Sequence, residues 1–253
     1  MTDFDKAMDA LEKGTLRVAE KVDGFWKVNA EVKEIILQGF RMGKIVEMNN
    51  GLFTYLDKDT FPPRRFTPED KVRIVPGGSA VRRGAYLAPS VVVMPPSYVN
   101  VGAWIGEGSM VDSNVIVGSC AQVGRNVHLA ANSQVGGVLE PAGALPVIIE
   151  DNAFIGGGSG VYEGTVIGEG AVIAAGVSIT RGTPVYDAVN DVFITAAENE
   201  SLKIPANAVV VAGTRPLKGE RAHELGIQVY MPVIIKYRDS RTSVSVALEE
   251  ALR

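Results

Sequence analysis

Several residue types are scarce in this chain of 253 residues, and each shortage excludes a class of protein. A single cysteine excludes a disulfide framework within the chain and is typical of a reducing compartment. A net charge of −4 argues against nucleic acid as the main partner. No apolar run approaches membrane-spanning length, and the start of the chain is acidic where a signal peptide would be basic. We therefore expect a cytoplasmic protein with neither a nucleic-acid nor a membrane partner.

What the sequence does contain is an aliphatic residue at every sixth position. A run of ten such positions is followed by a run of six and a final pair: Val81, Leu87, Val93, Val99, Ile105, Val111, Val117, Val123, Leu129 and Val135, then Ile149, Ile155, Val161, Ile167, Ile173 and Ile179, then Ile204 and Val210. A period of six is too short for a helical solenoid. It is the signature of a parallel β-helix, in which each hexad forms one flat face of a prism.

Two further columns of the repeat support this prediction. Four residues after each aliphatic residue the side chain is small or β-branched, so it can share a narrow interior with the large aliphatic groups. Three residues after it, 12 of the 16 hexads carry Gly or Asn, which best tolerate a positive φ angle and predict corners. These corners are Gly84, Gly102, Gly108, Asn114, Asn126, Asn132, Asn152, Gly158, Gly164, Gly170, Gly176 and Gly182. Three hexads then form one triangular coil, and 16 hexads give about five coils of ~4.8 Å rise before the final pair is added.

The period defines the domain organisation. We expect the prism over residues 76–213, with extruded loops at 136–146 and 184–203, where function tends to concentrate. Residues 1–75 lack the period and predict a small α/β domain. Its expected elements are a helix between Thr2 and Gly14 that begins with a capping box of Thr2 and Asp5, a hairpin over 16–29 with Asp23-Gly24 at its turn, and a helix that ends before Gly43.

Residues 214–253 predict a C-terminal extension. Its expected parts are a loop that carries Arg215 and Lys218, a strand over 229–236 and a short helix over 244–252. The expected fold class is therefore mainly β, with a parallel β-helix at its centre, a small α/β domain before it and a short strand and helix after it.

Outward-pointing acids are the first candidates for chemistry. The residue after each aliphatic position points outward and is usually Gly or Ala, and Asp112 and Glu150 are the only acids there. An outward carboxylate flanked by small residues is well placed to accept a proton from an attacking amine. A solvated surface acid is the alternative interpretation. Glu163 and Glu140 are further candidate acids, and Glu140, in the first extruded loop, is placed to reach a neighbouring chain.

The remaining candidates each carry a competing explanation. His128 suits a catalytic base, or a structural imidazole between coils. Cys120 suits a thioester nucleophile, but the sequence shows no base to orient it, and it lies in the corner column. With His223 the chain has two histidines, too few for the three-histidine zinc site of a prism-shaped carbonic anhydrase, so no metal is expected. Asn114 suits substrate binding, although its column predicts a corner.

An arginine cluster lies where the chain enters the prism. Arg73, Arg82 and Arg83 could give a dicarboxylate substrate the bidentate partners that it needs. A basic surface rim explains the same residues equally well.

Several segments together resemble one enzyme family. They are Leu16-Arg-Val-Ala-Glu-Lys-Val-Asp-Gly, Met94-Pro-Pro-Ser-Tyr-Val-Asn, Met110-Val-Asp, Val117-Gly-Ser-Cys-Ala-Gln-Val-Gly-Arg-Asn-Val-His-Leu, Gly136-Gly-Val-Leu-Glu-Pro and Ile148-Ile-Glu-Asp-Asn. The chain resembles the tetrahydrodipicolinate N-succinyltransferases of the diaminopimelate and lysine pathway, over nearly its whole length. The resemblance implies a left-handed prism, a homotrimer with active sites between neighbouring chains, and transfer of succinyl from succinyl-CoA to the amino group of 2-amino-6-oxopimelate.

The resemblance also implies roles for residues. Asp112 matches the principal catalytic acid and Arg73 an arginine that holds a substrate carboxylate, while Gly157, Ala174 and Ala175 match the CoA groove. On charge, Arg215 and Lys218 are expected to bind the CoA phosphates. No permanently bound cofactor is implied.

The chain departs from the family in its short N-terminal domain, in its second insertion, over residues 219–237 and at two specific positions. Gly160 stands where some members carry a glutamate, leaving Glu163 as the nearest acid, and Pro95-Pro96 replaces a single proline. A paralogue that uses acetyl-CoA or a related amino-acid acceptor, as in tabtoxin-type metabolism, is therefore the alternative function. A purely structural β-helix is the non-enzyme alternative, and the two extruded loops argue against it.

Overall fold

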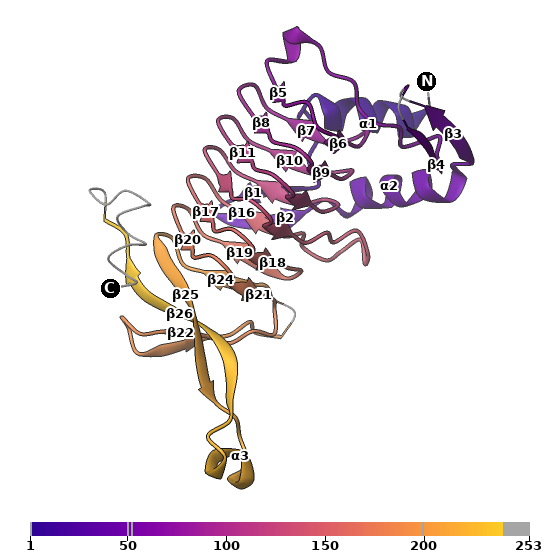
Figure 1. The fold of residues 1–253 in the computed structure, drawn as a ribbon. Coiled ribbons are helices and arrows are strands. Elements are labelled where there is room, and N and C mark those ends of the chain that lie inside the picture. The colour runs from indigo at the N-terminus through magenta and orange to yellow at the C-terminus, as the bar shows by residue number, and fades with distance from the viewer. Residues whose placement is uncertain (1, 50, 52, 199, 240–253) are drawn as a thin grey trace.

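The computed structural model describes residues 2–49, 51, 53–198 and 200–239. Its centre is a left-handed parallel β-helix, a triangular prism of strands stacked coil upon coil (Figure 1). The predicted fold class is confirmed. The terminal helix expected over 244–252 lies outside the described residues.

The three faces of the prism follow one another along the chain. The first face contains β6 (Ala80–Val81), β9 (Tyr98–Val99), β12 (Ile116–Val117), β15 (Gln134–Val135), β18 (Gly160–Val161) and β21 (Ser178–Ile179). The second contains β7 (Tyr86–Leu87), β10 (Trp104–Ile105), β13 (Gln122–Val123), β16 (Ile148–Ile149), β19 (Thr165–Ile167) and β24 (Leu202–Ile204). The third contains β5 (Arg73–Ile74), β8 (Val92–Val93), β11 (Met110–Val111), β14 (His128–Leu129), β17 (Phe154–Ile155), β20 (Val172–Ile173) and β25 (Ala208–Pro216). We name each edge by the two faces that it joins, in chain order.

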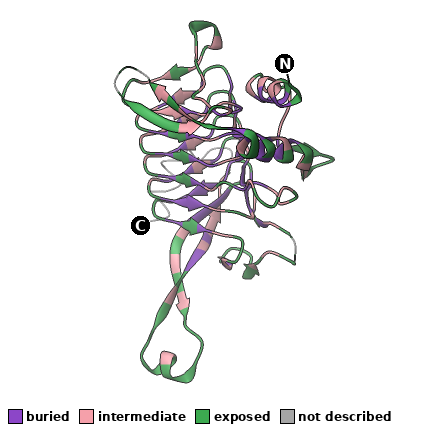
Figure 2. Ribbon diagram, turned by 90° about the vertical axis from the view of Figure 1, so that its right-hand side faces the viewer, coloured by how far each residue is buried: buried purple, intermediate pink, exposed green. Residues whose placement is uncertain are grey.

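The repeat predicted from the sequence is the repeat of the structure. Every aliphatic position is buried, and each stacks on its equivalent in the next coil, as Val111 does on Val93 and Leu129. The small column is buried as well, apart from the half-buried Thr183. All the predicted corners except Gly182 have positive φ, and Ser90 and Cys120 occupy two more. Figure 2 shows burial concentrated in the strands of the prism.

The prism is longer than predicted. Ile74 lies seven residues before Val81 rather than six, so β5 falls outside the period. It nevertheless pairs in parallel with β8 and extends the third face by one strand. The first and second faces are each six strands deep, as the 16 hexads and the final pair predict, so β5 is the one strand of the coils that the period missed.

The N-terminal domain contains the predicted elements and one more hairpin. The helix α1 (Asp3–Glu12) begins with the capping box of Thr2 and Asp5, the strands β1 (Ala19–Val22) and β2 (Phe25–Val28) form the first hairpin, and the helix α2 (Ala30–Met42) is capped by Gly43. The sequence did not predict the antiparallel strands β3 (Ile45–Asn49) and β4 (Thr54–Lys58), or the 3₁₀ turn η1 (Pro68–Asp70). Among the described residues no helix is long and apolar enough to span a bilayer.

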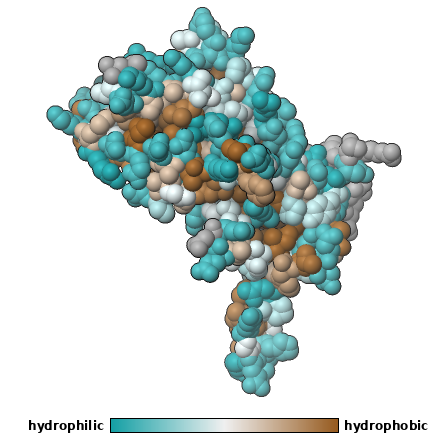
Figure 3. Space-filling view, turned by 180° about the vertical axis from the view of Figure 1, so that it is seen from behind, coloured by the Kyte–Doolittle hydropathy of each residue, from teal (hydrophilic) through white to brown (hydrophobic). Residues whose placement is uncertain are grey.

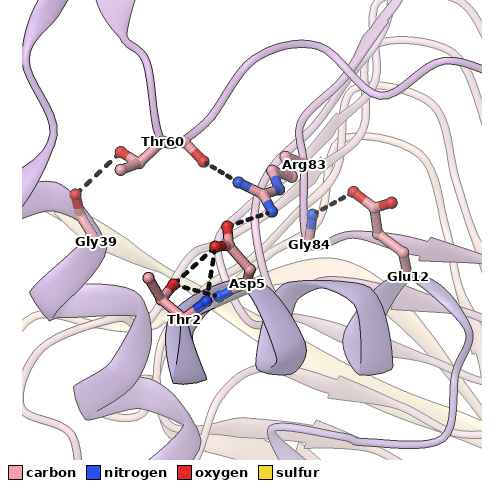
Figure 4. A network of polar contacts seen from close by, with 7 residues as sticks. All are labelled: Thr2, Asp5, Glu12, Gly39, Thr60, Arg83 and Gly84. Carbon is pink, nitrogen blue, oxygen red and sulfur yellow. Dashed lines mark hydrogen bonds and ion pairs between the residues drawn. The ribbon is translucent and has the colours of Figure 1, made fainter.

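Polar contacts join the N-terminal domain to the first coil (Figure 4). Arg83 donates to Asp5 Oδ1 at 2.9 Å and to the Thr60 carbonyl at 3.4 Å, and the Gly84 N–H donates to Glu12 at 2.9 Å. Hydrogen bonds from Thr2 and Arg83 lower the pKa of Asp5 to about 2. Arg83 therefore serves the domain contact, and Arg82 likewise pairs with Asp57, so neither is free for the substrate role considered above.

The C-terminal segments extend the third face. The second insertion forms a hairpin of β22 (Val185–Asp187) and β23 (Val192–Ile194), which joins the sheet through β26 (Gln228–Tyr237). The expected loop around Arg215 is wrong, because Arg215 belongs to β25, which pairs with β26 as a long hairpin that carries the helix α3 (Glu220–Glu224) at its tip. Figure 1 shows this hairpin projecting from the end of the prism.

Substitutions at two glycine corners allow the effect of backbone strain to be measured separately from the effect of packing against the N-terminal domain. Gly102 and Gly176 have φ of 74° and 73°, but a Cβ on Gly102 would lie 3.1 Å from Cys120 and Ile36, whereas one on Gly176 would meet nothing within 4 Å. We expect Gly176→Ala to lower the free energy of unfolding by about 1–2 kcal/mol through strain alone. Gly102→Ala should cost a further ~1–3 kcal/mol through overpacking. Denaturant unfolding followed by circular dichroism measures both, and equal losses would contradict the close contact.

Candidate active site

The third-to-first edge carries five of the ten residues predicted to form the site. Asp112 lies there directly after β11, with Asn114 at the corner two residues later. Gly157, Ala174 and Ala175 lie on the same edge in later coils. Backbone hydrogen bonds stack these corners, from Asn132 N–H to Ser113 (2.9 Å), from Gly158 N–H to Ala131 (3.0 Å) and from Gly176 N–H to Gly157 (3.0 Å). The structure therefore aligns the predicted acid with the predicted CoA positions.

Small residues follow Asp112 along this edge. The next three coils place there Ala130-Ala131, Gly156-Gly157 and Ala174-Ala175, which we call the small-residue strip. On the other two edges the equivalent pairs include large or charged residues such as Arg125, Asp151 and Tyr162, although the first-to-second edge also carries Gly118-Ser119 and Gly136-Gly137. Because Ala and Gly project little beyond the main chain, the strip offers backbone groups to an extended ligand.

Asp112 is held in one orientation. Its N–H donates to the Leu129 carbonyl at 2.9 Å, and its Oδ1 accepts from the Ser113 N–H at 2.7 Å. Its Oδ2 lies 3.8 Å from Nε2 of His128, on the adjacent strand β14. The side chain is 31% exposed, so a substrate can reach the carboxylate.

Arg73 lies on the third face, two strands from Asp112. It is exposed on β5, which pairs with β8, and β8 pairs with β11. Two strand spacings correspond to roughly 10 Å, within reach of a dicarboxylate that also meets Asp112. Its guanidinium has no partner among the described residues, unlike those of Arg82 and Arg83.

Glu163 and Glu140 lie on a different edge. Glu163 follows β18 at the first-to-second edge, and Glu140 belongs to the loop that leaves this edge after β15. Both line a cavity of about 1050 Å³ beside the β1–β2 hairpin, together with Trp26 and Lys203. Asp112 does not line this cavity. Within one chain, the two acids predicted to be catalytic, Asp112 and Glu163, are thus separated by the width of the first face.

A buried lysine holds the loop that carries Glu140. Lys33 of α2 is fully buried, and its Nζ donates to the carbonyls of Pro141 (3.1 Å) and Ala144 (2.9 Å). Burial lowers the pKa of this amine. Helix α2 therefore fixes the backbone of the extruded loop at two points.

The structure assigns structural roles to two other candidates. Glu150 accepts hydrogen bonds from Lys21 (2.7 Å) and Trp26 (2.8 Å), so it holds the β1–β2 hairpin. Burial raises the pKa of Glu150, but these hydrogen bonds outweigh that effect and the net pKa is lowered. Cys120 is buried, and desolvation raises the pKa of its thiol to about 12, which excludes a thiolate nucleophile at neutral pH.

Arg215 and Lys218 lie beyond the end of the small-residue strip. The Ala174 N–H donates to the Val210 carbonyl at 2.8 Å, so β25 lies next to the last coil of the strip. Earlier strands of the third face end at the third-to-first edge, where the chain turns. β25 is longer and continues past this edge, and Arg215 lies on the part that extends beyond it. Lys218 lies near the tip of the projecting hairpin, which is largely hydrophilic in Figure 3. Both cations are thus on the side of the strip away from Asp112.

The large cavity is the feature that sequence reasoning missed. It forms only when the β1–β2 hairpin packs over the second face. The six-residue period does not predict where that hairpin packs. Among the described residues, no group of three or more His, Cys, Asp or Glu side chains is arranged to hold a metal ion.

Three family profiles match the chain. A profile for the N-terminal domain of tetrahydrodipicolinate N-succinyltransferase matches residues 2–42, one for the bacterial transferase hexapeptide (six repeats) matches 102–137, and one for the hexapeptide repeat of succinyl-transferase matches 146–181. Together with the three parallel sheets, these matches define a hexapeptide-repeat acyltransferase.

Relatives identify the family. A 2,3,4,5-tetrahydropyridine-2,6-dicarboxylate N-succinyltransferase of Acinetobacter baylyi is 41% identical over 98% of this chain and 88% of its own, and one of Paramagnetospirillum magneticum is 43% identical over the same shares. The chain belongs to the tetrahydrodipicolinate N-succinyltransferase family, as the resemblance predicted. A solved structure of a Campylobacter jejuni protein proposed to be such an enzyme is 17% identical, with a TM-score of 0.49 over 92% of this chain and 62% of that one.

The contact between Lys33 and the loop predicts a pH-dependent stability difference. The pKa of Lys33 is lower in the folded than in the unfolded chain, so the folded chain binds fewer protons and stability rises with pH between these two values. Lys33→Met removes this gain and leaves two buried carbonyls unpaired, which costs about 1–3 kcal/mol. We expect the melting temperature of wild type to exceed that of Lys33→Met by more at pH 9.5 than at pH 7. A difference independent of pH would contradict the assignment.

Proposed function

We propose that this chain transfers the succinyl group of succinyl-CoA to the amino group of 2-amino-6-oxopimelate, the opened form of tetrahydrodipicolinate, in diaminopimelate and lysine biosynthesis. The observation that carries the proposal is the alignment of Asp112 with the small-residue strip on one edge. The names of the relatives supply the donor and the acceptor class. No tightly bound cofactor is needed, because acyl-CoA is a co-substrate.

The strip accommodates the pantetheine arm of CoA. Gly157, Ala174 and Ala175 leave room beside the main chain, and backbone amides of the prism stabilise the oxyanion of the tetrahedral intermediate. Arg215 and Lys218 lie past the far end of the strip, where the CoA phosphates would meet positive charge.

Asp112 accepts a proton from the attacking amine. The amine nitrogen forms a bond to the thioester carbon, the carbon–sulfur bond breaks, and CoA leaves as thiolate. One oxygen of Asp112 is fixed by Ser113, so the other is presented in a defined direction. Arg73 pairs with a substrate carboxylate, for which its guanidinium fork is suited. Asn114, at the exposed corner beside Asp112, is the remaining proposed substrate contact.

We infer a homotrimer whose sites lie between chains. Asp112 and Glu163 lie on different edges, and a rigid prism cannot bring its own edges together. A cyclic trimer apposes one edge of each chain to another edge of the next. The first face lies between these edges and exposes Tyr98 and Ile116 to 36% and 48%, which suits burial against neighbouring chains. Glu140 and Glu163 of one chain would then approach Asp112 of the next. We expect the enzyme to act in the cytoplasm.

Measuring the release of CoA tests the activity and the donor. Wild type should release CoA from succinyl-CoA in the presence of the acceptor, and from acetyl-CoA far more slowly. Asp112→Asn should remain a trimer but lose about 10²–10⁴-fold in kcat, because it removes the proton acceptor. Near-normal turnover of Asp112→Asn would remove Asp112 from the mechanism, and a preference for acetyl-CoA would favour the specialised paralogue.

Mixing two inactive variants tests whether the site is shared. Asp112→Asn and Glu163→Gln are purified separately and then refolded together in equal amounts. If each site combines Asp112 of one chain with Glu163 of its neighbour, about a quarter of the sites in random trimers are intact, and activity returns to about that fraction. Each variant refolded alone is the control. A mixture no more active than the two variants alone would mean that these acids do not share a site across chains.

A further inference from the structure

A buried imidazole nitrogen faces the reactive oxygen of Asp112. His128 and Asp112 lie on neighbouring strands of the third face, whose register pairs Met110 with His128. Oδ1 of Asp112 is occupied by the Ser113 N–H, so Oδ2 is the oxygen directed at His128, with Nε2 3.8 Å away. This separation is too long for a hydrogen bond but short enough that a small shift of either side chain would make one.

The environment of this nitrogen is unusual. Nε2 is buried and has no hydrogen-bond partner, although the His128 side chain as a whole is 43% exposed. The imidazole ring packs edge-on against Phe154, with centroids 5.3 Å apart. On the flanking strands it meets Met110 and Phe154, which carry no charge, so within the described part of the chain Asp112 is the ionisable group that faces it. An unpaired buried nitrogen is costly and needs a physical explanation, of which a role in a reaction is one. Of the unpaired buried polar atoms among the described residues, the His128 nitrogen is the one that faces Asp112.

The proposed reaction needs a place for a proton. Once the amine has added to the thioester, its nitrogen must lose a proton, and the departing CoA thiolate must gain one. A carboxylate is a weak base that can relay the proton but not hold it, whereas an imidazole is the stronger base in water and takes up and returns a proton near neutral pH. A carboxylate beside an imidazolium also stabilises its positive charge.

We propose that His128 is the positioning and proton-storing partner of Asp112, an inference that rests on the proposed acyl transfer. Asp112 Oδ2 takes the proton from the amine nitrogen and passes it to His128 Nε2. The carbon–sulfur bond breaks, and the proton returns through Asp112 to the CoA sulfur. The pair ends in the state in which it began, and no oxidant, reductant or metal takes part.

Chemical rescue distinguishes proton storage from a structural role. His128→Ala leaves space on a partly exposed surface, which added imidazole can enter. We expect kcat to fall by about 10²-fold or more with little change in KM, and imidazole to restore part of it. Substituted imidazoles should restore it in the order of their basicity. His128→Gln, which keeps a polar group near the position of Nε2, should retain the fold, lose activity and show no rescue.

Two controls keep the outcomes separate. His223→Gln changes the other histidine, exposed on α3, and should match wild type with and without imidazole. If His128→Ala or His128→Gln turns over at the wild-type rate, or if His128→Ala is slow and indifferent to every imidazole, the proton-storing role is overturned while acyl transfer by wild type stands. Failure of wild type to release CoA from any acyl-CoA with the acceptor would overturn the proposed function instead.

Discussion

Branched aliphatic side chains stack in the narrow interior of the prism, which has no room for other arrangements of these side chains. The strand register and the outer surfaces of the prism depend on this packing. Each hexad must place one such side chain inside and then turn a corner, so strands such as β8, β11 and β14 lie in strict parallel register. The same register aligns the outward columns. The residue that follows the buried aliphatic position of one coil therefore lies directly above the equivalent residue of the coil below. Where these equivalent residues are chemically similar, they form a continuous strip on the surface.

This alignment makes the edges of the prism into distinct surfaces. The third-to-first edge combines Asp112 with the small-residue strip, whereas the first-to-second edge carries Glu163 and the loop with Glu140. Because a close-packed interior does not deform to bring two edges together, any chemistry that needs both must use two chains. The rigidity that fixes the direction of Asp112 thus also accounts for the proposed assembly.

The period predicted the core, the corners and the strand positions because every hexad must bury one aliphatic side chain and then turn a corner. It did not predict β5, where Ile74 is one residue out of step, or the β3–β4 hairpin, which lies outside the repeat and exposes Ile45 and Leu56. The site residues divide in the same way. Asp112 stood out because Glu150 is the only other acid in its column. Arg82, Arg83 and Glu150 resembled site residues until their partners in the N-terminal domain were placed.

The sequence alone determined the prism, the family resemblance and the outward position of Asp112, since a six-residue period and short motifs are local properties of the chain. Only the tertiary structure decided which charged groups are already paired, that Glu163 lies a face away from Asp112, and that Nε2 of His128 is buried beside the carboxylate. These are contacts between residues far apart in the chain or on adjacent coils. Their geometry depends on how the N-terminal domain and the coils pack, and no local pattern specifies it.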